Sequence, residues 1–148
     1  MRLLIFHVDE FTCTITRKGR SGLVETPTSR AAHIDAGLLA LIAVEVDDGD
    51  AVAQVAEGAA AEIVKLATQL KVHDVMLLPF AHLFVEPGPA EQAVEIIDYA
   101  AARLRLDGLD VQRAPFGWFH SWEMRAKGHP LSRVARTIRP SEASHTVA

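Results

Sequence analysis

The stretch from Ala51 to Leu70 constrains the fold more than any other part of this chain, because it is long, rich in alanine and regularly patterned. Alanine has the highest helix propensity of all residues. The larger apolar residues recur at helical spacings, at Val52, Val55, Ile63, Leu66 and Leu70. This pattern predicts an amphipathic helix with one apolar face.

Short apolar runs typical of strands lie on both sides of this helix. Leu38–Val46 (LLALIAVEV) is apolar enough for a central strand, and Asp74–Leu78 (DVMLL) predicts a short buried strand that ends before a proline. A second helix is expected over Ala90–Leu106, because a Gly-Pro pair precedes it and its apolar residues again follow helical spacing.

The N-terminal part predicts two further strands, Arg2–Val8 and Phe11–Arg17, paired as a hairpin around Asp9-Glu10. Lys18–Ser29 contains Gly, Ser, Thr and Pro and is expected to be a mobile loop.

The C-terminal part predicts strands at Leu109–Ala114 and Trp118–Arg125, separated by a turn. After Lys127–Pro130 we expect a short helix reaching Ile138, and a disordered tail beyond Pro140. The order of elements indicates an α/β fold with two main helices and an antiparallel component.

The length of 148 residues suits one domain. The single cysteine excludes an internal disulfide and a multi-cysteine zinc site, in agreement with a reducing compartment. The opening residues lack the apolar region of a secretory signal, and no run approaches the ~18 consecutive apolar residues of a membrane span. We therefore expect a soluble, cytoplasmic protein without a membrane partner.

The net charge of −4 argues against a simple polyanion binder, but the charges are unevenly distributed. Residues 1–100 hold seven Lys/Arg and 15 Asp/Glu, whereas residues 101–139 hold eight Lys/Arg and three Asp/Glu. The C-terminal part could thus form a basic face that meets a nucleic acid, or a solvated surface without a partner.

No familiar catalytic motif occurs: there is no phosphate-binding glycine loop, no G-x-S-x-G and no H-E-x-x-H. His7 and Asp9 share a face of the first strand and form either an oriented imidazole with its carboxylate or a structural surface pair. Cys13 lies in an alternating strand and is expected to be a small buried apolar residue. Scattered histidines without paired cysteines give a weak zinc signal, so we predict no metal.

Trp118, His120 and Trp122 alternate along one predicted strand and therefore share a face. They form either an aromatic platform on which a nucleobase stacks or the core-facing side of that strand.

Four segments together resemble a known family. They are Met1–Asp9 (MRLLIFHVD), Pro79–Leu83 (PFAHL), Ala114–Gly117 (APFG) and Lys127–Leu131 (KGHPL). Their order and spacing resemble the N-terminal editing domain of archaeal threonyl-tRNA synthetases over residues 1–138, which leaves residues 139–148 as a flexible tail or linker.

The resemblance implies a fold similar to that of D-aminoacyl-tRNA deacylases, a homodimer and a pocket for the 3′ end of tRNA(Thr) carrying serine. It implies hydrolysis of L-seryl-tRNA(Thr) but not of L-threonyl-tRNA(Thr), assisted by the ribose 2′-hydroxyl, without a cofactor. The rest of a threonyl-tRNA synthetase is a possible partner. Two alternatives stay open: a D-aminoacyl-tRNA deacylase, and a non-catalytic module for tRNA binding or dimerisation.

Family roles carried over by position give ten site residues. The catalytic candidates are His82 and His120, and the substrate-binding candidates are Val44, Glu45, Pro79, Phe80, Ala81, Phe116, Gly117 and Phe119. The sequence departs from the family pattern at His120, where many relatives have lysine, and at Arg133, where they often have glutamate. Arg133 is therefore not counted in the site.

Overall fold

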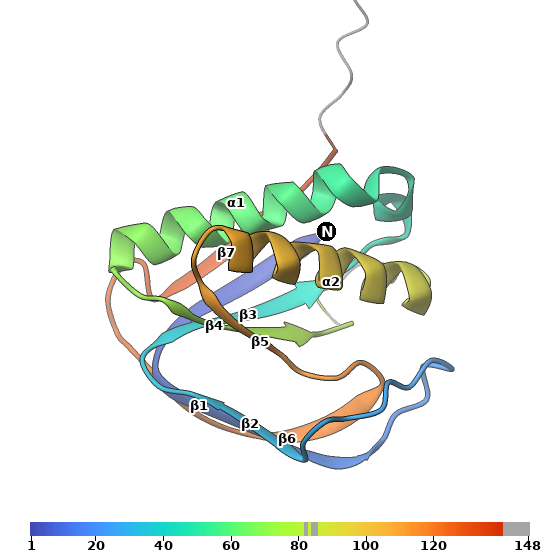
Figure 1. Ribbon diagram of the computed structural model, residues 1–148, viewed down its shortest axis with the longest axis horizontal. Helices are drawn as coiled ribbons and strands as arrows, with labels where there is room; N and C mark the ends of the chain where they lie inside the picture. The colour runs from blue at the N-terminus through green and yellow to red at the C-terminus, as the bar shows by residue number, and fades with distance from the viewer. Residues whose placement is uncertain (82, 84–85, 141–148) are drawn as a thin grey trace, which may run out of the picture.

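The computed structural model describes residues 1–81, 83 and 86–140 (Figure 1). These residues form a mixed sheet covered on one side by two α-helices, α1 (Val52–Leu70) and α2 (Ala90–Leu106). A 3-10 helix, η1 (Val46–Ala51), precedes α1. The strands are β1 (Arg2–Lys18), β2 (Ala31–Ile34), β3 (Gly37–Ala43), β4 (Asp74–Pro79), β5 (Asp110–Arg113), β6 (Trp118–Ala126) and β7 (Arg133–Thr137).

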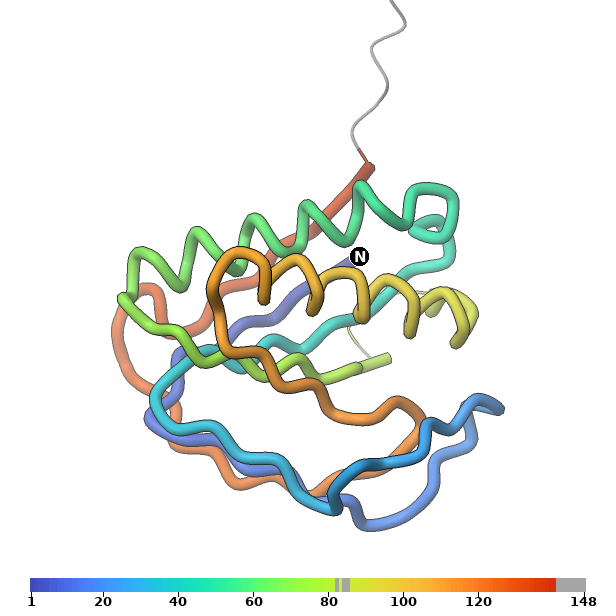
Figure 2. Tube along the Cα trace, in the orientation of Figure 1, coloured from blue at the N-terminus to red at the C-terminus, as the bar shows by residue number. Residues whose placement is uncertain are grey.

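Strand β1 runs without a turn through the place where a hairpin was expected, so that prediction is wrong (Figure 2). Its first half pairs with β3 on one edge and β7 on the other, and its second half pairs with β2 and β6. The register with β6 shifts between Val8 and Glu10, which marks a bulge at Asp9. A bulge adds one residue and bends the strand, so Asp9-Glu10 changes the direction of β1 rather than reversing it.

The parallel part of the sheet is β3–β4–β5, in which consecutive strands are joined through α1 and α2. Such crossovers place both helices on one face of the sheet. All seven residues of β3 are buried, as expected for a central strand with covered faces. The two helices predicted from periodicity are confirmed, with α1 starting one residue later than expected.

Bending of β1 creates a second apolar cluster on the sheet face opposite the helices. It includes Phe11 and Cys13 from β1, Leu39 from β3 and Met76 from β4. Cys13 is 2% exposed, and burial raises the pKa of its thiol, so it is the buried apolar residue that the sequence predicts.

The predicted C-terminal helix is wrong, because Arg133–Thr137 forms strand β7. β7 pairs with the first half of β1, and the Ile138 N–H donates to the Met1 carbonyl at 2.8 Å just beyond it. An unpaired edge of β1 needs partners for its backbone groups, and this tertiary demand outweighs local helix propensity.

Candidate functional site

A cavity of about 490 Å³ opens where β4 ends, between the turn that precedes β6 and the loop that follows β1. Its volume lies within the ~300–1,000 Å³ usual for small-molecule sites. It is larger than a hollow of about 390 Å³ at the opposite ends of β4 and β5. Ligands of open α/β sheets commonly bind beyond the carboxyl ends of parallel strands, which is where this cavity lies.

Seven of the ten predicted site residues line this cavity: Pro79, Phe80, Ala81, Phe116, Gly117, Phe119 and His120. Val44 and Glu45 do not line it. Val44 is buried in the core beneath the helices, and the Glu45 carboxylate accepts a hydrogen bond from Arg2 Nε at 2.8 Å. His82 lies outside the described residues. The chemical roles assigned to all ten remain predictions.

The aromatic stripe of β6 faces the cavity: Trp118, His120 and Trp122 all line it. The Phe80 ring lies 6.1 Å from the Trp122 ring, centroid to centroid, and continues the aromatic wall from β4 onto β6. Flat rings of this kind bind a nucleobase by stacking, whatever its hydrogen-bonding edge.

His120 supplies the imidazole of the cavity. Burial lowers its pKa below the ordinary 6.5, while a backbone hydrogen bond with Trp118 acts in the opposite direction. Its Nε2 is buried and has no hydrogen-bond partner among the described residues. A neutral imidazole with an unused ring nitrogen can accept a hydrogen bond from a ligand hydroxyl or water.

Glu25, in the loop after β1, fixes the turn that forms one wall of the cavity. Its carboxylate accepts a hydrogen bond from the Phe116 N–H at 2.6 Å, and its N–H donates to the Phe116 carbonyl at 3.1 Å. Its own carbonyl accepts a hydrogen bond from Trp118 Nε1 at 2.8 Å. The loop that we expected to be mobile is therefore docked onto the turn by three hydrogen bonds from one residue.

Arg113 connects this arrangement to helix α2. Its Nη1 lies 2.7 Å from Glu25 Oε1, and its Nε lies 2.9 Å from Asp98 Oδ1. The Arg113 side chain is 11% exposed and that of Glu25 is 27% exposed, so their contact is partly shielded from water, whereas the Asp98 side chain is 58% exposed. Sequence reasoning missed Glu25 and Arg113, because a charged residue in a loop and another at a strand end carry no local signal of their contact.

Gly117 has a φ of +91°, in the left-handed region that favours glycine. A Cβ at this position would collide with the Leu23 carbonyl oxygen and with Val24 Cα. The Gly117 carbonyl accepts a hydrogen bond from the Gly19 N–H at 2.7 Å. Main-chain atoms of two tightly packed segments therefore form this wall.

The sequence left open whether the C-terminal cations form a basic face or a solvated surface. Five of the eight cations in residues 101–139 make ion pairs with carboxylates: Arg103, Arg113, Arg125, Lys127 and Arg136. Their charge is largely neutralised locally. Around the cavity, Arg20 is the one charged side chain among the described lining residues, and no carboxylate lines it.

His7 and Asp9 do not form a pair with each other; each contacts the segment before β7. His7 Nδ1 lies 2.8 Å from His129 Nε2, and Asp9 Oδ1 accepts a hydrogen bond from Lys127 Nζ at 2.5 Å. Leu131 N–H donates to His129 Nδ1, so the neutral His129 ring carries its proton on Nε2 and donates it to His7. None of these residues lines the cavity, which favours the structural interpretation of the His7 and Asp9 side chains.

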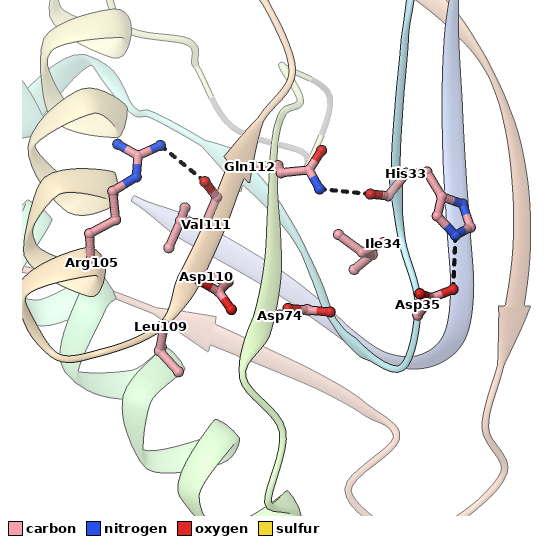
Figure 3. A pocket seen from close by; sticks show the side chains of 9 residues that line it. All are labelled: His33, Ile34, Asp35, Asp74, Arg105, Leu109, Asp110, Val111 and Gln112. Carbon is pink, nitrogen blue, oxygen red and sulfur yellow. Dashed lines mark hydrogen bonds and ion pairs between the residues drawn. The ribbon is translucent and has the colours of Figure 1, made fainter.

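The hollow at the opposite ends of β4 and β5 is polar, and three of its side chains form hydrogen bonds or an ion pair with neighbouring lining residues (Figure 3). Gln112 Nε2 donates to the His33 carbonyl at 2.7 Å, Arg105 Nη2 donates to the Val111 carbonyl at 3.0 Å, and His33 Nε2 lies 3.0 Å from Asp35. The Gln112 bond joins β5 to β2, the two ends of the main strand order. This side-chain bond therefore links the two ends of the main strand order across the hollow.

Within the described residues, no group of three or more His, Cys, Asp or Glu side chains is placed to hold a metal ion. No helix in the same part of the chain is long and apolar enough to cross a membrane.

Comparison with known proteins points to the family that the four sequence segments resemble. Threonine--tRNA ligase of Methanopyrus kandleri is 35% identical over 143 residues, covering 97% of this chain, and that of Methanothrix thermoacetophila is 38% identical over 143 residues, covering 96%. The chain spans only 23% of the length of each of these relatives.

Among solved structures, the c-Myc DNA Unwinding Element Binding Protein superposes with a TM-score of 0.67 and 12% identity, over 94% of this chain and 99% of the other. At this identity the likeness concerns the fold alone, and it confirms the expected class, a D-aminoacyl-tRNA deacylase-like α/β fold. Residues 1–138 match the family described as the archaea-specific editing domain of threonyl-tRNA synthetase. With the family match covering nearly the whole chain, the protein belongs to this family of editing domains.

Proposed function

We propose that this domain hydrolyses the ester of L-seryl-tRNA(Thr) and spares L-threonyl-tRNA(Thr). The observation that carries the proposal is the cavity lined by Phe80, Phe116, Gly117 and His120, whose aromatic side suits the terminal adenine and whose backbone turn suits the amino acid. The absence of a carboxylate among its described lining residues also suits an anionic tRNA end.

Discrimination between serine and threonine requires a wall that does not yield to one methyl group. One methyl is worth only about 1–3 kcal/mol in a binding site, or 10–200-fold, so a synthetase gains from a second, hydrolytic selection step. The turn at Phe116-Gly117 is hydrogen-bonded to Glu25 and Gly19 and packs against Leu23 and Val24. A wall of main-chain atoms cannot rotate away as a side chain can, so it can exclude the extra methyl.

In the proposed reaction a water oxygen attacks the ester carbonyl carbon, and the bond to the ribose 3′ oxygen breaks. The proton lost by the water passes to that leaving oxygen, which yields free serine and a tRNA with a 3′-hydroxyl. The vicinal 2′-hydroxyl of the tRNA positions the water, so the protein's main contribution is orientation of the ester. This division of labour explains why the chain carries no nucleophile motif.

His120 is proposed to accept a hydrogen bond in the ester region through Nε2, which has no partner among the described residues. Its lowered pKa keeps the ring neutral at neutral pH, unlike the lysine of many relatives. His82 is proposed as the second polar contact, on the strength of the family resemblance. If the 2′-hydroxyl performs the main assistance, His120→Ala slows deacylation only modestly, by less than the roughly 10²–10⁴-fold that loss of a general acid or base typically costs.

The test compares four esters on the same tRNA(Thr): L-seryl, L-threonyl, a D-aminoacyl ester, and L-seryl on a tRNA ending in 2′-deoxyadenosine. The proposal expects rapid hydrolysis of the first and little of the others. Preferred cleavage of the D-ester would favour a D-aminoacyl-tRNA deacylase, and cleavage of none at saturating enzyme would favour a non-catalytic tRNA-binding or dimerisation module. Rapid cleavage of the 2′-deoxy substrate would refute the role of the ribose hydroxyl.

We further propose that the domain acts as a homodimer. We also propose that it is associated with the rest of a threonyl-tRNA synthetase, since this chain spans only 23% of the length of the relative from Methanopyrus kandleri. Sedimentation equilibrium of the domain tests the dimer directly, and a monomer at micromolar concentration would argue against it.

A further inference from the structure

A second hollow adjoins the cavity and is lined by Arg17, Lys18, Arg20 and Phe119, with a volume of about 360 Å³. Arg20 and Phe119 line both spaces, so the hollow continues the cavity outward. In Figure 1 this region lies where the end of β1 meets the start of β6.

Arg17, Lys18 and Arg20 differ from most cations of the C-terminal part in having no carboxylate partner. Within the described part of the chain, no ion pair involves any of the three, and all three side chains are exposed. The domain is acidic overall, with a net charge of −4. A cluster of three unpaired cations on such a protein is a local attraction for an anion.

The backbone beneath these cations is held in place. Arg17 pairs with Phe119 and Lys18 with Trp118 in the β1–β6 register, and Thr16 Oγ1 donates to the Phe119 carbonyl at 3.2 Å. The Arg17 guanidinium carbon lies 5.2 Å from the centre of the Phe119 ring, which is 51% exposed. The hollow thus offers an aromatic surface flanked by cations on an ordered strand pair.

We propose that this hollow binds the single-stranded nucleotides that precede the terminal adenosine of the tRNA, with Arg17 and Lys18 contacting their phosphodiesters and Phe119 contacting a base. A cluster of cations beside an exposed aromatic ring is a usual combination in single-strand binding. Arginine and lysine supply charge-assisted hydrogen bonds to phosphate oxygens. Arg20, at the boundary with the cavity, would face the phosphate closest to the adenosine.

This inference rests on the proposed function for the identity of its ligand, but binding can be measured without hydrolysis. The probe is an RNA tetranucleotide, ACCA, that carries a 5′ fluorophore and no amino acid. It is titrated with wild type, Arg17→Glu, Lys18→Glu and the double variant. Lys65→Glu is the matched control, since Lys65 is also exposed and has no ion pair among the described residues, but lies on α1. Thermal unfolding of each variant checks that its fold is intact.

We expect the double variant to bind ACCA at least tenfold more weakly than the control Lys65→Glu. The control reverses one charge, and the double variant reverses two. The association constant K decreases as the salt concentration rises. The plot of log K against log salt should become less steep by about 0.7 for each phosphate contact removed. Equal weakening by Arg17→Glu and Lys65→Glu would show only an effect of net charge and would overturn the proposal, as would a double variant with wild-type affinity and salt slope.

Hydrolysis supplies a second readout. We expect the double variant to lower the ratio of kcat/KM for seryl-tRNA(Thr) to kcat/KM for seryl-adenosine at least tenfold, because the adenosine ester has no phosphate. An unchanged ratio would overturn the proposal. If wild type hydrolyses neither ester, the proposed function fails, and the ACCA titration still decides whether the hollow binds single-stranded RNA.

Discussion

Replacing Glu25 by alanine should both destabilise the domain and reduce its ability to distinguish serine from threonine. The change removes the carboxylate that accepts a hydrogen bond from the Phe116 N–H at 2.6 Å and that lies 2.7 Å from Arg113 Nη1. The backbone bonds of Glu25 to Phe116 and Trp118 do not depend on its side chain. The variant therefore loosens the wall of the cavity without deleting any residue that lines it.

The magnitude follows from the two lost contacts. A hydrogen bond to a charged group contributes about 1.5–3 kcal/mol, and a largely buried arginine left without a partner costs more. Arg113 keeps its contact with Asp98, and the Glu25 side chain is 27% exposed, so both contributions are reduced. We expect Glu25→Ala to lower the free energy of unfolding by about 2–3 kcal/mol, or the Tm by about 4–12 °C for a domain of this size.

The assay is urea unfolding together with deacylation of seryl- and threonyl-tRNA(Thr). Glu25→Gln keeps an acceptor for the Phe116 N–H but loses the charge opposite Arg113, so it should lose about 1 kcal/mol. Glu95→Gln, at an exposed position of α2, is the control and should change nothing. In Glu25→Ala the preference for the seryl ester should fall severalfold. Wild-type stability and selectivity in Glu25→Ala would refute the idea that this carboxylate fixes the wall.

Two more outcomes are expected. Gly117→Ala should unfold at a lower urea concentration than wild type and lose deacylation, because its Cβ would meet the Leu23 carbonyl at a positive φ; retention of both properties would contradict the packing of this turn. Burial, His129 and Lys127 lower the pKa of His7, against an opposing effect of Asp9. Its contribution to stability is therefore complete above pH 6.5 and declines as pH falls from 6.5 through the lowered pKa of the folded state. Urea unfolding between pH 8 and pH 5 should show this loss in wild type and less of it in His7→Asn, and parallel curves would contradict it.

Much of the fold was predictable because its signals are local. The helical spacing of Val55, Ile63 and Leu66 identifies α1, and the predicted start of this helix differs from the observed one by one residue. The uniformly apolar segment LLALIA identifies the central strand β3. Helical and strand periodicities depend only on residues a few positions apart. The two helices and the parallel strands could therefore be placed from sequence alone.

The errors occurred where distant segments decide the structure. Asp9-Glu10 looks like a turn, but β1 continues through it because partners exist along both edges of the strand. Arg133–Thr137 becomes a strand because the first half of β1 leaves an edge to be paired. Neither partner is visible from the local pattern.

The same contrast between local sequence signals and contacts of distant segments applies to the cavity. The aromatic alternation on β6 and the segments around Phe80 and Phe116 were evident in the sequence, and the structure brings them together around one space. By contrast, the contact between Glu25 and Phe116 spans 91 positions, and the pairing of the C-terminal cations with carboxylates leaves Arg17, Lys18 and Arg20 as a free cluster beside the cavity. The sequence by itself determined which residue types were available and which local elements they form. Only the tertiary structure decided which charges neutralise each other, because Coulomb and hydrogen-bond energies depend on distances that chain separation does not specify.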